Sequence, residues 1–149
     1  MFRSLTSIFR SLPCLFLLLA LATGCDSAPD PADEVRERLV GTWLRDYEEN
    51  GTRVRRVLVL EPQGRFREMS RSLGPQEPGT RHAHEGDWLY DGTNLKRRYT
   101  LMDGQPVSAP TMPFAAFQIR FTGSHEFRGV DNVRHRELRY QRAPAGTEP

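Results

Sequence analysis

Histidine, glutamate and arginine side chains alternate with aromatic residues in several stretches of this 149-residue chain. His82 and His84 have the same parity as Trp88, and a strand with a period of two would place all three on one face. The same rule places a set of polar side chains beside apolar neighbours in other stretches. This candidate ligand-binding set consists of Glu68, His82, His84, Arg97, Arg134 and Arg136.

Three interpretations of this set remain open from the sequence. In the first, the residues lie in solvent at strand ends, and bulges break the parity. In the second, Glu68 pairs with an arginine in a buried or half-buried ion network, which is costly unless every charge is satisfied. In the third, the arginines and histidines converge in a cleft that binds an anionic head group such as a carboxylate or a phosphate.

A His-x-His spacing can present two imidazoles to a metal from one strand face. Glu68 or His135 would have to supply a third ligand, and no spacing requires it, so we predict no metal and no cofactor. The serines that could act as nucleophiles have no nucleophile-elbow context, and no phosphate-binding loop occurs. We therefore expect a protein that is not an enzyme, with a metal-binding protein or a small hydrolase as distant alternatives.

Cys25 follows a segment with the layout of a secretory signal. Arg3 and Arg10 lie at the start, and the apolar run over 12–22 is shorter than the about 20 residues that span a bilayer. Ala22-Thr-Gly-Cys25 resembles the lipobox of bacterial lipoprotein precursors. The resemblance implies a signal peptide over 1–24 and lipidation of Cys25 with acyl chains such as palmitate. The alternative is an ordinary cleaved signal followed by an unmodified cysteine.

The resemblance also implies a location in the cell envelope. A lipid-anchored chain would face the periplasm from the inner or the outer membrane. Cys14 would leave with the signal and Cys25 would be acylated, so we expect no disulfide within the chain.

Charge and composition divide the rest of the chain. Two of the 21 basic residues lie in the signal, so 19 basic residues remain against 19 acidic ones. This balance argues against nucleic acid as a partner, because phosphate binding needs a net basic surface. Proline-rich residues 25–33 predict a lipidated tether, residues 143–149 predict a disordered tail, and residues 34–142 predict one domain.

The domain has the pattern of an all-β protein that a short helix opens. Asp33 is the predicted helix cap and Gly41 the predicted end. Turn signals such as Asn50-Gly51 separate short runs of aromatic and β-branched residues. The predicted strands are 42–49, 52–61, 65–72, 81–90, 95–102, 114–122, 125–130 and 133–142. Eight consecutive antiparallel strands favour a small up-and-down barrel, and a β-sandwich is the alternative.

Two Gly-x-Trp-Leu motifs, at Gly41 to Leu44 and at Gly86 to Leu89, carry a second resemblance. Glycine lets a strand bend and its backbone pass close to a neighbour, and Trp43 and Trp88 can fill the barrel interior. The pattern resembles the lipocalins of the calycin superfamily, in particular small bacterial lipocalin-like domains. The resemblance implies a basic residue of the last strand across the first tryptophan. The candidates are Arg139 and Arg142, and Arg139 completes the predicted barrel plug.

These expectations describe a lipid-anchored periplasmic β-barrel that binds a small amphipathic or apolar ligand. The alternative is an envelope module for protein–protein interaction, which would use its outer face or the loop over 104–113. An internal cavity above roughly 300 Å³ would favour the ligand. An apolar patch near Met112, Pro113 and Phe114 would favour a partner protein.

Overall fold

The computed structural model of this protein describes residues 30–74, 79–108 and 113–149. The predicted signal peptide, Cys25 and most of the predicted tether lie outside the described residues, and so does Met112. Within the described ranges, no helix combines the length and the apolar character needed to cross a membrane.

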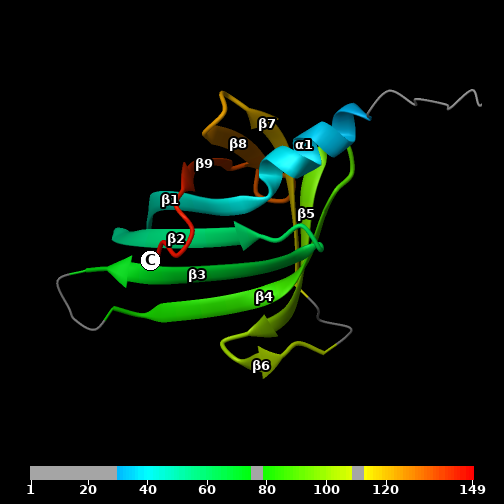
Figure 1. The fold of residues 1–149 in the computed structure, drawn as a ribbon. Coiled ribbons are helices and arrows are strands. Elements are labelled where there is room, and N and C mark those ends of the chain that lie inside the picture. Colours follow the sequence, from blue (N-terminus) through cyan, green and yellow to red (C-terminus); the bar gives the residue numbers. More distant parts are fainter. Residues whose placement is uncertain (1–29, 75–78, 109–112) are drawn as a thin grey trace, which may run out of the picture.

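Eight antiparallel strands close into a barrel (Figure 1). They run in the order β1-β2-β3-β4-β5-β7-β8-β9, and β9 pairs with β1 again. Each strand of the barrel pairs with the barrel strand that follows it in the sequence. The fold is therefore the predicted up-and-down barrel and not a sandwich. The strands are β1 (Gly41–Glu49), β2 (Thr52–Leu60), β3 (Arg65–Leu73), β4 (Arg81–Tyr90), β5 (Asn94–Met102), β7 (Phe114–Phe121), β8 (Glu126–Asp131) and β9 (Glu137–Ala143). A further two-residue strand, β6 (Gln105–Pro106), pairs only with the end of β5, inside the predicted loop.

The helix α1 (Pro31–Leu39) begins earlier than predicted. The side chain of Asp30 caps it by accepting a hydrogen bond of 2.8 Å from the backbone N–H of Ala32. Pro31 occupies the first turn, where its missing N–H costs no helical bond. Asp33 therefore lies in the first turn and is not the cap, and the ordered domain begins inside the segment assigned to the tether.

Large apolar side chains fill the barrel interior. Trp43 packs edge-on against Phe127, with ring centroids 4.7 Å apart, and Phe127 stacks on Tyr140 at 5.1 Å. Within the contiguous interior cluster, seven residues are no more than 1% exposed: Leu39, Trp43, Leu58, Leu60, Phe66, Leu95 and Phe127. This packing occupies the space that a large apolar ligand would need.

Both tryptophans face the interior near the end of the barrel where α1 leads into β1, which we call the helix end. Trp43 is fully buried and Trp88 is 4% exposed. The indole N–H of Trp43 donates to the carbonyl of Leu39 at 2.7 Å, and that of Trp88 donates to the carbonyl of Glu61 at 2.9 Å. Each buried indole thus has a partner, as its polar N–H requires.

Arg142 packs across Trp43, and Arg139 does not. The guanidinium carbon of Arg142 lies 4.2 Å from the centroid of the Trp43 ring. Arg139 has the opposite parity to the buried Tyr140, so its side chain points outward and pairs with Glu126 at 2.6 Å. The role that we assigned to Arg139 in the plug therefore belongs to Arg142.

The segment after β9 has a described course. Residues 144–149 form a turn in which the backbone N–H of Thr147 donates to the carbonyl of Pro144 at 3.2 Å. The chain then runs toward β3 (Figure 1), where Glu148 lines a hollow together with Met69. The segment predicted as a disordered tail therefore lies along the barrel wall in this structure.

Candidate functional site

The end of the barrel opposite the helix end, which we call the mouth, contains a hollow of about 120 Å³. Two acidic side chains, Glu49 and Asp131, belong to its lining. Five guanidinium groups line it too, from β1, β2, β5 and the turn between β8 and β9: Arg45, Arg56, Arg97, Arg134 and Arg136. The mouth is therefore a polar site with an excess of arginine above an apolar core.

A buried ion pair forms the base of the mouth. Glu68 on β3 and Arg97 on β5 are each 2% exposed, and Nη1 of Arg97 donates to Oε2 of Glu68. Nη1 of Arg56 lies 3.6 Å from the other oxygen, Oε1. The rings of Phe66 and Phe117 lie 5.4 and 5.2 Å from the Arg97 guanidinium, which places these charges in an apolar setting. This is the buried network of the second interpretation.

The ion pair keeps Glu68 charged. Burial alone would raise the pKa of Glu68, but Arg97, His84 and Arg56 more than offset that effect and hold the pKa well below its usual range. Burial likewise acts to lower the pKa of Arg97, and Glu68 reverses this, so that the net shift is upward. One carboxylate thus faces two guanidinium groups, and the base of the mouth carries a net positive charge.

Three buried polar atoms around this hollow have no hydrogen-bond partner among the described residues. They are Nε of Arg56, Nε of Arg97 and the hydroxyl oxygen of Tyr140, which is 3% exposed. An unpaired buried polar group costs about 1–3 kcal/mol, and native proteins therefore pair nearly all of them. All three residues line the hollow, so an anionic oxygen or an ordered water in the hollow would supply the missing bonds.

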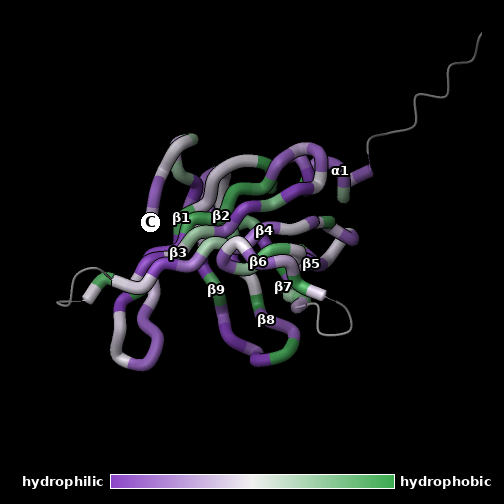
Figure 2. The backbone as a smooth tube through the Cα atoms, turned by 90° about the horizontal axis from the view of Figure 1, so that it is seen from below, coloured by the Kyte–Doolittle hydropathy of each residue, from purple (hydrophilic) through white to green (hydrophobic). Residues whose placement is uncertain are grey.

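The turn between β8 and β9 forms the rim of the mouth. Asp131 organises this turn, because its Oδ1 accepts hydrogen bonds of 2.8 and 3.0 Å from the backbone N–H groups of Val133 and Arg134. Nη1 of Arg136 lies 3.9 Å from Oε1 of Glu49. In Figure 2 the chain at this turn is mainly hydrophilic, with a short hydrophobic stretch beside the tip. Arg134 and Arg136 are exposed, so their guanidinium groups are accessible to a ligand.

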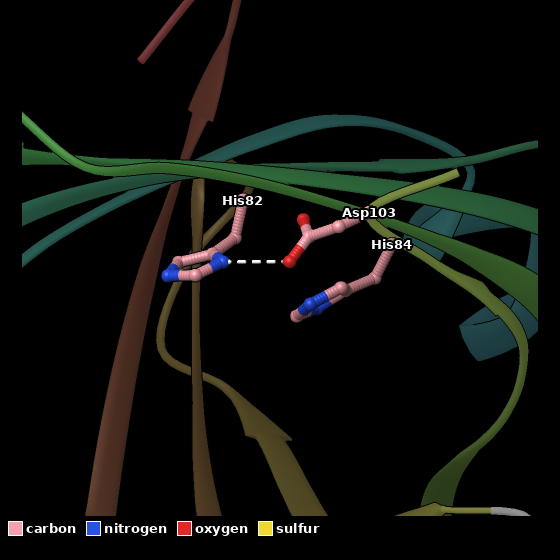
Figure 3. Close-up of side chains that lie close together, drawn as sticks. All are labelled: His82, His84 and Asp103. Carbon is pink, nitrogen blue, oxygen red and sulfur yellow. Dashed lines mark hydrogen bonds and ion pairs between the residues drawn. The ribbon is translucent and has the colours of Figure 1, made fainter. Parts of the chain in front are cut away.

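The two predicted histidines differ in their surroundings. His84 is half-buried, and its Nδ1 lies 3.5 Å from Oε1 of Glu68. His82 is exposed, and its Nδ1 lies 2.9 Å from Oδ2 of Asp103 (Figure 3). The third ligand that we considered for a metal was Glu68 or His135, whereas Asp103 is the carboxylate that lies beside both imidazoles.

The structure thus divides the predicted set into connected groups. Glu68, Arg97 and His84 form the buried network, and Arg134 and Arg136 line the same hollow as Arg97. His82 belongs to a separate cluster with Asp103. The set therefore combines the buried network with a charged cleft above it.

Sequence reasoning missed Arg45, Arg56 and Asp103. A signal existed for the first two, because Arg45 shares the parity of Trp43 on β1 and Arg56 shares that of the buried Leu58 on β2. Asp103 gave no such signal, because it lies in a turn and reaches β4 only through the pairing of β4 with β5.

Comparison with known proteins does not assign this chain to a family. No protein-family model matches this chain, and a search of curated proteins finds no match. The closed eight-stranded barrel is consistent with a lipocalin-like fold.

Proposed function

We propose that this protein is a lipid-anchored, non-enzymatic β-barrel of the bacterial envelope that binds a small anionic ligand at its mouth. The observation that carries the proposal is the ring of five arginines around one hollow. Below it, Nε of Arg97 and the hydroxyl of Tyr140 are buried without a hydrogen-bond partner in the described part of the chain. Guanidinium groups bind carboxylates and phosphates through paired, charge-assisted hydrogen bonds. A carboxylate or a phosphate is therefore the recognised group.

The size of the hollow limits what enters the barrel. Its volume of about 120 Å³ is well below the about 300–1,000 Å³ of sites that enclose a drug-sized ligand. Phe66 and Leu58 pack the interior and are no more than 1% exposed. An amphipathic ligand would place its anionic head in the mouth and keep its apolar part outside the barrel.

The charge balance favours an anion over a neutral ligand. At the base, Arg56 and Arg97 share the single carboxylate of Glu68. At the rim, the carboxylate of Asp131 is engaged by two backbone N–H groups of its own turn. A bound anion would neutralise guanidinium charge that the protein's own acids leave unbalanced.

The test compares anion binding by the parent chain and by variants with altered charge. Inorganic phosphate and octanoate are titrated into the full chain, and binding is followed by calorimetry and by ¹H–¹⁵N chemical shifts. The site variant is Arg134→Gln, and Arg120→Gln, at an exposed arginine of β7, is the control because it removes the same single charge. A hydrogen bond to a charged group contributes about 1.5–3 kcal/mol, so the site variant should weaken binding by at least about tenfold.

Two outcomes would contradict this proposal. One is the absence of shift changes in the β8–β9 turn at millimolar concentrations of both anions. The other is an equal loss of affinity in the site variant and in Arg120→Gln, which would mean that the anions respond only to net charge.

An envelope partner protein is the second candidate function. Leu89 on β4 and Phe114 on β7 are 52% and 60% exposed. They line one hollow of about 310 Å³ on the outer wall, next to the region where we predicted an apolar patch. Cross-linking in intact membranes with the parent and with Leu89→Ser and Phe114→Ser together tests this surface. A specific adduct that is lost only in the variant would support it.

A further inference from the structure

We propose that His82, His84 and Asp103 bind a transition-metal dication, for which Zn²⁺ is the probe ion. One potential ligand atom from each residue lies within 4.8 Å of those of the other two. Figure 3 shows the two imidazoles projecting from β4 on the same side, with the Asp103 carboxylate next to them. This cluster includes none of the mouth arginines, so the inference is independent of the proposed function.

The backbone fixes Asp103 against the residue between the two histidines. The N–H of Asp103 donates to the carbonyl of Ala83 at 2.7 Å. In return, Oδ1 of Asp103 accepts a hydrogen bond of 2.8 Å from the N–H of Ala83. Asp103 also has a φ of 48°, a left-handed conformation that aspartate tolerates better than most residues. These bonds hold the carboxylate beside both imidazoles, with Oδ2 facing Nδ1 of His82 at 2.9 Å.

Glu68 orients the second histidine from behind. Its Oε1 lies 3.5 Å from Nδ1 of His84, and its own charge is fixed by the ion pair with Arg97. When Nδ1 carries the proton toward Glu68, the lone pair of His84 lies on Nε2. Metal-binding histidines commonly have such a carboxylate behind them, because it sets the tautomer and the ring orientation. This contact is a second observation, from a side chain that is 2% exposed, that supports a metal site.

The donor set selects the class of ion. Two imidazole nitrogens and one carboxylate oxygen suit Zn²⁺, Cu²⁺ or Ni²⁺, whereas Ca²⁺ and Mg²⁺ prefer sites made of oxygen alone. On binding, the ion would replace the direct 2.9 Å contact between Nδ1 of His82 and Oδ2 of Asp103. Three protein ligands leave further coordination positions for solvent. A hollow of about 280 Å³ next to His82 and Asp103 gives that solvent room.

The experiment titrates Zn²⁺ and Co²⁺ into the full chain. Calorimetry gives the Zn²⁺ stoichiometry and affinity, and the visible absorption of Co²⁺ reports the geometry of the ligands. The site variants are His82→Ala, His84→Ala and Asp103→Asn, and His125→Ala is the control because His125 is exposed and lies outside the cluster. All variants keep both cysteines, so a contribution from thiols is the same in each.

We expect the parent and His125→Ala to bind one Zn²⁺ at this site with equal affinity. Removing a residue that only supports a metal ligand weakens metal binding by about 10–100-fold. Loss of a ligating histidine should weaken Zn²⁺ binding by at least this factor and should remove the Co²⁺ absorption. The side chain of His82 is 49% exposed, so His82→Ala should retain the native near-ultraviolet circular dichroism and give a readable result. Equal Zn²⁺ affinity in the parent and in His82→Ala would overturn the inference, as would no binding to the parent at millimolar Zn²⁺. Either result would leave anion binding by Arg134 and Arg136 unaffected.

Discussion

Arg142 covers Trp43, with its guanidinium carbon 4.2 Å from the centroid of the ring, and so joins the last strand to the first. The same guanidinium donates at 3.0 Å to the carbonyl of Val40, at the C-terminal end of α1, where a cation is favourable. Gly41 makes room for it, because a Cβ there would lie 2.6 Å from Nη1 of Arg142. One side chain thus connects the helix, the first strand and the last strand.

Removal of this contact should destabilise the barrel. Arg142→Gln loses the hydrogen bonds to the end of α1 and the cover over Trp43, for which we expect a cost of about 1–3 kcal/mol. Arg139→Gln on the outer face should change the free energy of unfolding by no more than about 0.5 kcal/mol. Urea unfolding followed by tryptophan fluorescence measures both. Equal effects of the two variants would contradict the assignment of Arg142 to the plug.

The buried pair of Glu68 and Arg97 should respond very differently to single and double substitution. Glu68→Leu leaves the buried Arg97 without a carboxylate and should cost about 3–5 kcal/mol. Arg97→Met should cost less, because Arg56 still lies 3.6 Å from Glu68. The double variant removes both charges and should recover most of that loss, because apolar replacements of buried pairs are often neutral or stabilising. A double-mutant cycle from urea unfolding gives the coupling energy. Simple additivity of the two losses would show that the pair is not coupled.

Stability should fall in acid partly because of Glu68. Its pKa in the folded protein lies well below the ordinary value of 4.5, so ionised Glu68 contributes its full stabilisation above that value. As the pH falls below 4.5, the unfolded chain takes up a proton that the folded protein refuses, and the stabilisation is lost progressively toward the folded pKa. The free energy of unfolding between pH 7 and pH 2.5 should therefore fall less steeply in Glu68→Gln than in the parent. Parallel curves would contradict the depressed pKa.

Gly86 should not tolerate a side chain. A Cβ there would lie 1.9 Å from the carbonyl oxygen of Arg98 and 2.9 Å from the ring of Phe66. Gly86→Ala should therefore lower the free energy of unfolding by about 1–3 kcal/mol or more, the cost typical of an overpacked core. Gly123→Ala is the matched control, because a Cβ at Gly123 would meet nothing within 4 Å. Equal melting temperatures of the two variants would show that β4 and β5 are less closely packed at this point.

The proposed lipid anchor at Cys25 can be tested separately from the barrel. Cys25→Ser removes the thiol that would be acylated, and we expect the protein to move from the membrane fraction to the soluble fraction of the envelope. Stable anchoring requires two or more acyl chains, so mass spectrometry of the N-terminal peptide of the parent should show their mass. Circular dichroism should be the same for both proteins. Retention of Cys25→Ser in the membrane would contradict anchoring through this residue.

Local patterns predicted the barrel well, because each pattern acts within a few residues. Asn50 and Gly51 have φ values of 51° and 74°, as the predicted tight turn between the first two strands requires. Alternation placed Trp43, Trp88 and Glu68 inside the barrel. The helix start was predicted wrongly, because we expected Asp33 to be the cap and the structure uses Asp30, three residues earlier.

The sites depend on relationships between strands, which local patterns do not contain. Parity places His82 on the same face as Trp88, but the register between β4 and β5 shifts at Glu85 and Gly86, which lie between these two residues. His82 is exposed and contacts Asp103. Parity also groups Arg97 with Arg134 and Arg136, yet only closure of the sheet brings β5 and the β8–β9 turn to one hollow. The choice of Arg142 over Arg139 was open to the parity argument, since Leu138 and Tyr140 already defined the inward face.

The first and last strands of the barrel meet along a short seam. β1 and β9 pair over three positions, from Thr42 opposite Ala143 to Leu44 opposite Gln141. The sheet cannot close until β9 has emerged from the ribosome or, for an exported protein, from the translocation channel. A chain truncated before β9 would present two free edges, on β1 and β8, and we expect such a fragment to associate edge to edge instead of folding.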